Sequence, residues 1–199
     1  MTTSTTRRLA IFLGLAAVMG VTRIHLSLLD HALWDASWGV FFLAGFWLRG
    51  QVRWALPLLL AEAVLVDYLV ITGQGIDFWS AYCVSPAYWF LAPAYSALWA
   101  GGSWLAKRQR GLNLNTLALA VGALLVAEGA CYLISNGSYY WLAATVPGPR
   151  SVGAWFANLG DWYAPFLIGT AAYVALGGVL HALATQLARS TQRDGQTQR

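Results

Sequence analysis

Residues Ile76–Tyr95 read IDFWSAYCVSPAYWFLAPAY and join two long apolar segments of the chain. The stretch places one thiol, that of Cys83, among seven aromatic rings and two prolines. A cysteine is often a small buried hydrophobe, but an accessible thiol is also a nucleophile and a soft metal donor. The second interpretation is favoured because Cys83 lies in a connection between apolar segments and its neighbours are rings that stack on flat ligands.

The composition around this stretch is that of a membrane protein. Of the 199 residues, 58% are hydrophobic and 10% are charged, whereas roughly 25% are charged in ordinary soluble domains. A soluble fold with so few charges would leave much apolar surface in water, but lipid solvates such a surface. The 11 tryptophans and nine tyrosines fit this class, because amphipathic rings gather at membrane interfaces. The net charge is +4, but the basic residues lie next to the ends of the apolar segments and do not form a patch that would bind nucleic acid. No nucleic-acid partner is therefore expected.

We therefore predict an all-α, polytopic membrane protein with a single transmembrane domain of six helices. Each apolar segment has about the 20 residues that are needed to cross roughly 30 Å of hydrocarbon. The predicted helices are approximately 9–28, 31–48, 54–72, 86–105, 114–134 and 164–188, followed by a polar C-terminal tail at 189–199.

The basic residues predict the orientation of these helices. Ten of the twelve fall on one side of a six-helix topology: Arg7, Arg8, Arg49, Arg53, Lys107, Arg108, Arg110, Arg189, Arg193 and Arg199. The positive-inside rule makes that side cytoplasmic, so both termini are expected inside. The two long connections, 72–85 and 135–163, then face outward, the second with a short interfacial helix at 151–162. Because long, aromatic-rich connections are usually functional, the binding site is expected on the outer face.

Four ionisable residues are predicted to share one layer of the membrane. Each lies fourteen or fifteen residues from a polar or basic residue at the cytoplasmic boundary, or about 21 to 23 Å along a helix: Arg23, Asp35, Asp67 and Glu128. Charges at such depth are costly unless they are paired or hydrated. Two interpretations stay open and are compatible: Arg23 neutralises Asp67 or Glu128 as a structural lock, or the layer forms the floor of an outward-open pocket.

The other candidate donors are weaker than Cys83. Cys131 lies in an apolar helix, where thiols are usually inert. The chain has no Cys-x-x-Cys and no His-x-x-x-His motif, and the spacing of His25 and His31 is too loose for a zinc site. Cys83 is thus the candidate metal ligand, and coordination to a metal would deprotonate its thiol.

The six-helix pattern with both termini inside resembles the substrate-binding subunits, or S-components, of energy-coupling-factor vitamin transporters. Within that group, the segment from Tyr82 to Tyr88, YCVSPAY, resembles the small BtuM-like cobalamin transporters of Gram-negative bacteria. The resemblance implies an S-component-like bundle in the bacterial cytoplasmic membrane, with a site that takes a corrinoid from outside in its base-off form. It also implies that Cys83 is the axial cobalt ligand, and that removal of cyanide from cyanocobalamin is possible chemistry.

The resemblance also assigns further residues to the site. Tyr88 falls on the tyrosine that follows the cysteine, and His31 and Arg150 match a polar histidine and an arginine near the site. The expected site is completed by Tyr82 and Trp79, among the flanking rings, and by Asp67 in the polar layer.

Partners follow from the same resemblance. S-components dock on an energy-coupling-factor ATPase module, although BtuM-like proteins are thought to work without a dedicated one. The chain has no Gly-x-x-x-x-Gly-Lys-Ser/Thr motif, so any ATP must be hydrolysed by another protein. Membrane lipid and a corrinoid are the other expected partners.

Two alternatives remain open at the level of sequence. The first is a membrane transpeptidase of the exosortase kind, with Cys83 as nucleophile, His25 or His31 as base, and Arg23 or Arg150 stabilising an oxyanion. The second is an S-component for another vitamin, in which Cys83 has no role in binding.

Overall fold

The computed structural model describes residues 5–28 and 35–197. These residues form helices and connections without any strand, which confirms the all-α prediction for the described part of the chain. The α-helices are α1 (Thr5–Leu28), α2 (Ser37–Trp47), α3 (Val52–Gly73), α4 (Leu91–Arg108), α5 (Leu114–Leu142) and α6 (Val152–Thr197). Three short 3-10 helices lie between them: η1 (Arg49–Gln51), η2 (Phe78–Ser80) and η3 (Pro86–Phe90).

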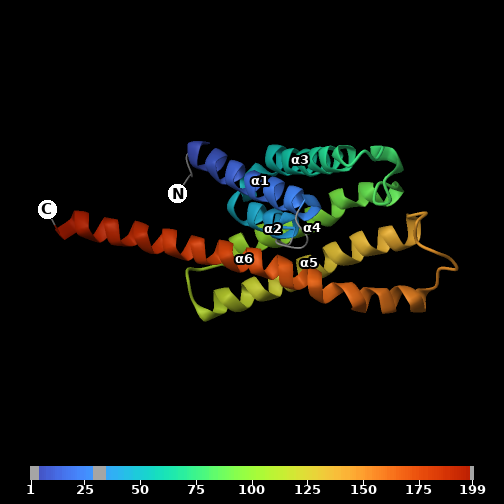
Figure 1. Ribbon diagram of the computed structural model, residues 1–199. Coiled ribbons are helices and arrows are strands. Elements are labelled where there is room, and N and C mark those ends of the chain that lie inside the picture. The colour runs from blue at the N-terminus through green and yellow to red at the C-terminus, as the bar shows by residue number, and fades with distance from the viewer. Residues whose placement is uncertain (1–4, 29–34, 198–199) are drawn as a thin grey trace.

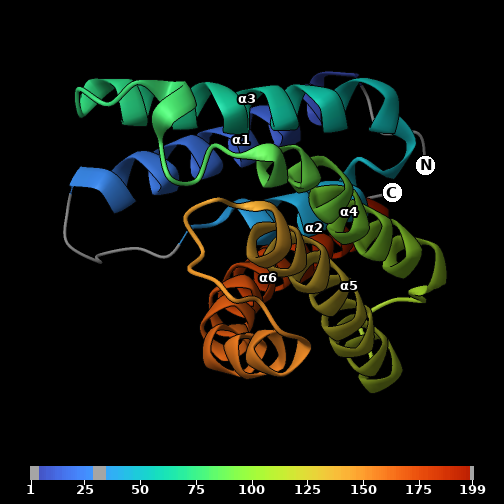
Figure 2. The same cartoon turned by 90° about the vertical axis from the view of Figure 1, so that its right-hand side faces the viewer.

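The helices form layers, with α1 and α3 side by side on one face and α5 and α6 on the other (Figures 1 and 2). Helices α2 and α4 lie between these pairs, and the most extensive packing is of α4 against α2 and α5. The start of α1 and the end of α6 lie toward the same end of the bundle, together with the α4–α5 connection (Figure 1). The α3–α4 and α5–α6 connections lie at the opposite end.

Among the described residues, three helical stretches are long and apolar enough to cross a membrane: Arg49–Gly73, Leu114–Leu142 and Val152–Ser190. This finding indicates a membrane protein. Side chains on these stretches are extensively exposed, among them Leu65, Leu69, Val126 and Leu180, as expected of a surface that faces lipid.

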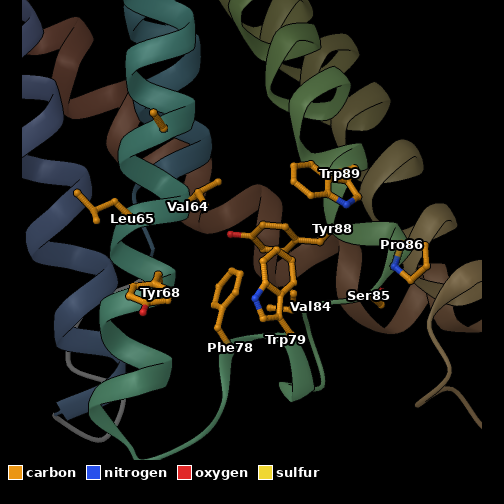
Figure 3. Close-up of a pocket in the computed structure, with 11 residues that line it drawn as sticks. Val64, Leu65, Tyr68, Phe78, Trp79, Val84, Ser85, Pro86, Tyr88 and Trp89 are labelled. Atoms are coloured by element: carbon orange, nitrogen blue, oxygen red, sulfur yellow. The ribbon is translucent and has the colours of Figure 1, made fainter.

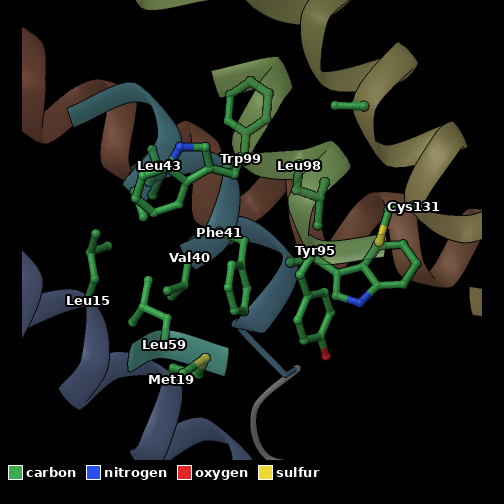
Figure 4. Close-up of a cluster of buried hydrophobic side chains, with 14 of the residues drawn as sticks. Leu15, Met19, Val40, Phe41, Leu43, Leu59, Tyr95, Leu98, Trp99 and Cys131 are labelled. Carbon is green, nitrogen blue, oxygen red and sulfur yellow. The ribbon is translucent and has the colours of Figure 1, made fainter. Parts of the chain in front are cut away.

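Helix α2 is the centre of the core (Figure 4). Nine of its 11 residues are buried, from Ser37 to Gly45, so this helix has no solvent- or lipid-facing side over that length. Glycines bring its backbone against α4: a Cβ on Gly45 would overlap the Trp99 backbone, and a Cβ on Gly102 would overlap the Phe42 carbonyl. Such small residues allow close helix packing in membranes, where van der Waals contact rather than the hydrophobic effect drives association.

The start of the second and fourth predicted helices differs from the structure. Helix α2 begins at Ser37, with Ala36 before its first residue, and the predicted start at 31 lies outside the described residues. The Asp35 carboxylate accepts from the Ser37 backbone N–H at 2.9 Å. At 11 residues, α2 is only about 16 Å long, about half the thickness of the hydrocarbon core. The predicted start at Pro86 is a 3-10 helix, and α4 proper begins at Leu91. Pro93 is tolerated there because it lies in the first turn.

The predicted outer loop at 135–163 is wrong over most of its length. Helix α5 continues to Leu142 and α6 begins at Val152, so the expected interfacial helix at 151–162 is the first part of α6. Residues in the expected loop join the two helices instead: Asn136 donates to Asn158 at 2.9 Å and accepts from Trp155 Nε1 at 3.1 Å. Helix α6 also runs through Pro165 and extends to Thr197, where a polar tail was predicted. Its last part extends beyond the bundle in Figure 1.

Candidate functional site

The connection between α3 and α4 is built from two capped turns. The Asp77 carboxylate accepts from the backbone N–H and the hydroxyl of Ser80, at 3.0 and 2.9 Å, and so begins η2. The Ser85 hydroxyl accepts from the Ala87 N–H at 3.2 Å and begins η3, with Pro86 in its first position. Cys83 lies between these turns, so the local sequence fixes the backbone on both sides of the thiol.

A pocket of about 680 Å³ lies between this connection and α3 (Figure 3). Its volume is in the range of small-molecule sites, about 300–1,000 Å³. Its walls are mostly apolar and aromatic: Ala61, Val64, Leu65, Tyr68, Phe78, Trp79, Val84, Ser85, Pro86, Tyr88 and Trp89. In Figure 3 the rings of Phe78, Trp79 and Tyr88 gather in the space between the connection and α3. Phe78 contacts both of the other rings edge-on, with centroids 5.2 and 6.1 Å apart.

Cys83 is half-buried and directly precedes Val84 and Ser85 in the pocket wall, although it does not itself line the pocket. Neither it nor Cys131 is in a disulfide. Burial raises the pKa of the Cys83 thiol above its ordinary value, and the negative charge of Asp67 raises it further, while the Arg23 guanidinium opposes the shift. The free thiol is therefore mostly protonated at neutral pH, and coordination to a metal would displace this proton.

A carboxylate connects the pocket to the bundle. Asp67, on α3, receives three hydrogen bonds from the Arg23 guanidinium of α1, at 2.8 to 3.0 Å. Tyr88, in the pocket wall, donates to the same carboxylate at 2.7 Å. Of the two partners left open for Arg23, the structure shows Asp67 and not Glu128, and the pair also holds η3 against α1 and α3.

The Nη1 atom of the Arg23 guanidinium faces α2 and α4. This atom donates to the Ser37 hydroxyl at 2.6 Å and to the Tyr95 hydroxyl at 3.3 Å, and lies 3.6 Å from the Asp35 carboxylate. Ser37 in turn donates to Asp35 at 2.6 Å. Three of the four residues predicted to share a layer therefore form one network, and Glu128 is outside it.

The predicted site residues separate into three groups. Tyr88 and Trp79 line the pocket, with Trp79 70% exposed at its edge, and Asp67 lies behind it. Tyr82 is next to Cys83 and 72% exposed. Arg150 is elsewhere: it donates to the carbonyls of Trp141 and Ala143, at 2.6 and 2.5 Å, and so closes the C-terminal end of α5.

His31 lies outside the described residues, and His25 belongs to α1, in a part of that helix whose side chains are not described.

Sequence reasoning missed two polar partners and one wall of the pocket. Ser37 and Tyr95 bind Arg23, and Trp89, 67% exposed, lines the pocket beside Tyr88. Tyr95 follows Tyr88 by seven residues, or about two helical turns, and this spacing could have suggested a shared face. No comparable pattern identifies Val64 and Leu65, which belong to a wall that only the packing of α3 creates.

Within the described residues, no group of three or more His, Cys, Asp or Glu side chains is arranged to hold a metal ion. A metal that brings its own equatorial ligands needs only one protein donor, and the Cys83 thiol fits that requirement. No protein-family model and no curated protein sequence matches this chain.

Proposed function

We propose that this chain binds a corrinoid and carries it across the bacterial cytoplasmic membrane, with the Cys83 thiolate as the axial cobalt ligand. The observation that carries the proposal is a free, half-buried thiol in the same connection whose next residues, Val84 and Ser85, line an apolar, ring-lined pocket. A soft sulfur donor suits cobalt, and the aromatic walls suit a flat macrocycle.

Each part of the site has a separate task in this proposal. Trp79, Tyr88 and Trp89 offer apolar surface to the ring, and Cys83 offers the lone pair. Asp67 and Arg23 hold Tyr88 in position from behind. The raised pKa of Cys83 keeps the thiol protonated, and thus less reactive toward other electrophiles, until cobalt binds.

The thiol also supports exchange of a cyanide ligand. A sulfur lone pair forms the bond to cobalt, cyanide leaves with the electron pair of the cobalt–carbon bond, and the thiol proton converts it to hydrogen cyanide. The oxidation state of cobalt is unchanged, so this step needs no reductant.

The proposal includes six membrane-crossing segments with both termini in the cytoplasm and the site facing outward. It is supported by the common end of the bundle at which α1 starts and α6 ends, because ten of the basic residues flank that end in the six-helix topology. An energy-coupling-factor ATPase module is the candidate partner for transport.

The test is the visible absorption spectrum of purified protein with bound cobalamin. The wild-type chain and Cys131→Ala are expected to show the same sulfur–cobalt absorption, and Cys83→Ser is expected to lose it. Cobalamin binding with an unchanged spectrum in Cys83→Ser would overturn the ligand role, and absence of binding by the wild-type chain would overturn the function.

A further inference from the structure

Glu128 is the buried ionisable side chain that the proposed site does not use. It lies on α5, is 0% exposed, and neither of its carboxylate oxygens has a hydrogen-bond partner within the described part of the chain. Arg23, the cation of the predicted layer, does not neutralise Glu128, because it is paired with Asp35 and Asp67. Such a group in a close-packed interior is unusual, since buried polar atoms are nearly always satisfied.

The surroundings of Glu128 favour its neutral form. The titratable side chains around it are the Tyr163 hydroxyl on α6, which faces the carboxyl, and Cys131 and Tyr132 on α5 itself. On α4, Tyr95 faces Cys131 and is hydrogen-bonded to Arg23. None of these neighbours is a base. An ionised carboxylate that faces a neutral hydroxyl but no cation costs several kcal/mol in an apolar interior, so a proton on Glu128 removes most of the penalty.

A route for that proton lies on the cytoplasmic side of the proposed topology. A second pocket, of about 610 Å³, lies between α2, α5 and α6 and is lined by Leu117, Ala120, Val121 and Leu124 of α5. Leu124 precedes Glu128 by four residues, or one helical turn, and is 8% exposed. Gln109 and Asn113 of the α4–α5 connection line the same pocket. Thr116, in the first turn of α5, and His181, which accepts from Trp47 at the end of α2 at 3.4 Å, line it too.

We propose that Glu128 is a proton-binding site, protonated in the conformation described here, that exchanges its proton past Leu124 with the cytoplasmic-side pocket. On release, the O–H bond breaks, its electron pair stays on the carboxylate, and the proton passes to water in the cytoplasmic-side pocket. Helix α6 contributes both the Tyr163 hydroxyl that faces the carboxyl and one wall of this pocket, so it connects the two. The link between this proton and transport rests on the proposed function, whereas proton binding itself does not.

The first test is infrared difference spectroscopy of the unliganded protein in lipid vesicles during a pH titration. The C=O band of a protonated, buried carboxyl is expected to persist far above pH 4.3, approximately the ordinary pKa of glutamate. The band is expected to be absent from Glu128→Gln and present in Glu62→Gln, a matched change in another transmembrane carboxyl. A wild-type spectrum without this band at pH 6, or a band that survives in Glu128→Gln, overturns the proposal.

The second test separates the transport link from the proton site. Cobalamin uptake into vesicles is expected to change with internal pH for the wild-type chain and to be independent of it for Glu128→Gln, whose amide mimics the neutral acid. Equal pH dependence in both overturns the link. Loss of cobalamin binding by the wild-type chain, with the infrared band intact, would overturn the proposed function and leave the proton site standing.

Discussion

The hydroxyl of Tyr88 donates to Oδ2 of Asp67 at 2.7 Å, across the gap between the α3–α4 connection and α3. Because Asp67 also receives the Arg23 guanidinium, one carboxylate joins the pocket wall to helices α1 and α3. The ring of Tyr88 lines the pocket while its hydroxyl is held from behind. The position of the ring therefore depends on charges in the bundle, not on the connection alone.

Replacing Tyr88 by Phe keeps the ring and removes this bond. A hydrogen bond to a charged group contributes about 1.5–3 kcal/mol, and we expect cobalamin affinity to fall by about tenfold, which corresponds to about 1.4 kcal/mol. Titration followed by visible absorption measures the change. Tyr139→Phe is the matched control, since the Tyr139 hydroxyl pairs with Thr145 in the α5–α6 connection at 3.1 Å, and its affinity should be unchanged. Equal affinity of both variants would show that the Tyr88 hydroxyl has no positioning role.

The reactivity of Cys83 should depend on pH in a defined direction. Burial and Asp67 raise the pKa of the thiol, so the thiolate fraction is small at neutral pH. Alkylation by iodoacetamide should speed up by about tenfold per pH unit and still be rising above the ordinary cysteine pKa of about 8.5. Mass spectrometry of the Cys83 peptide gives the rate.

The same assay tests the contribution of Asp67. Asp67→Asn removes a negative charge that raises the pKa of Cys83, so alkylation at pH 7 should become faster. Asp77→Asn alters a carboxylate in the same connection that caps η2, and the rate should stay at the wild-type value. A slower rate in Asp67→Asn would contradict the electrostatic assignment.

Release of cyanide should require the thiol. Mixing excess wild-type protein with cyanocobalamin is expected to liberate about one equivalent of hydrogen cyanide, because the sulfur replaces cyanide on cobalt. Cys131→Ala should behave like the wild-type chain, and Cys83→Ser should release none. A cyanide electrode and the visible spectrum report the two products independently.

Helix packing gives a prediction on stability. A Cβ at Gly102 would overlap the Phe42 carbonyl of α2 and lie 2.9 Å from the Phe46 nitrogen, so the backbones must separate. We expect Gly102→Ala to lower the free energy of unfolding by about 1–3 kcal/mol. Gly122→Ala, on α5, meets nothing within 4 Å and should leave it unchanged or raise it slightly. Thermal unfolding in detergent compares the two, and equal midpoints would contradict the close approach of α2 and α4.

Local chemistry accounts for what could be predicted about the fold. Apolar length identified helices over each of the six segments, because an apolar run in lipid must satisfy its backbone within itself. Their ends were less certain. Helix α2 begins only at Ser37, and Asn136, which reads as a loop residue in sequence, lies inside α5, where Asn158 and Trp155 of α6 satisfy its side chain.

For the candidate site, too, some features follow from the sequence and others only from the tertiary structure. The sequence by itself determined that Cys83 lies in a ring-rich connection between apolar segments, since this depends on the order of residues alone. Only the tertiary structure decided that Arg23 binds Asp67 and not Glu128, that Tyr88 completes this network, and that Arg150 closes α5. Depth along a helix follows from counting residues, but the partner of a charge depends on how neighbouring helices are rotated and packed, which a single chain sequence does not encode locally.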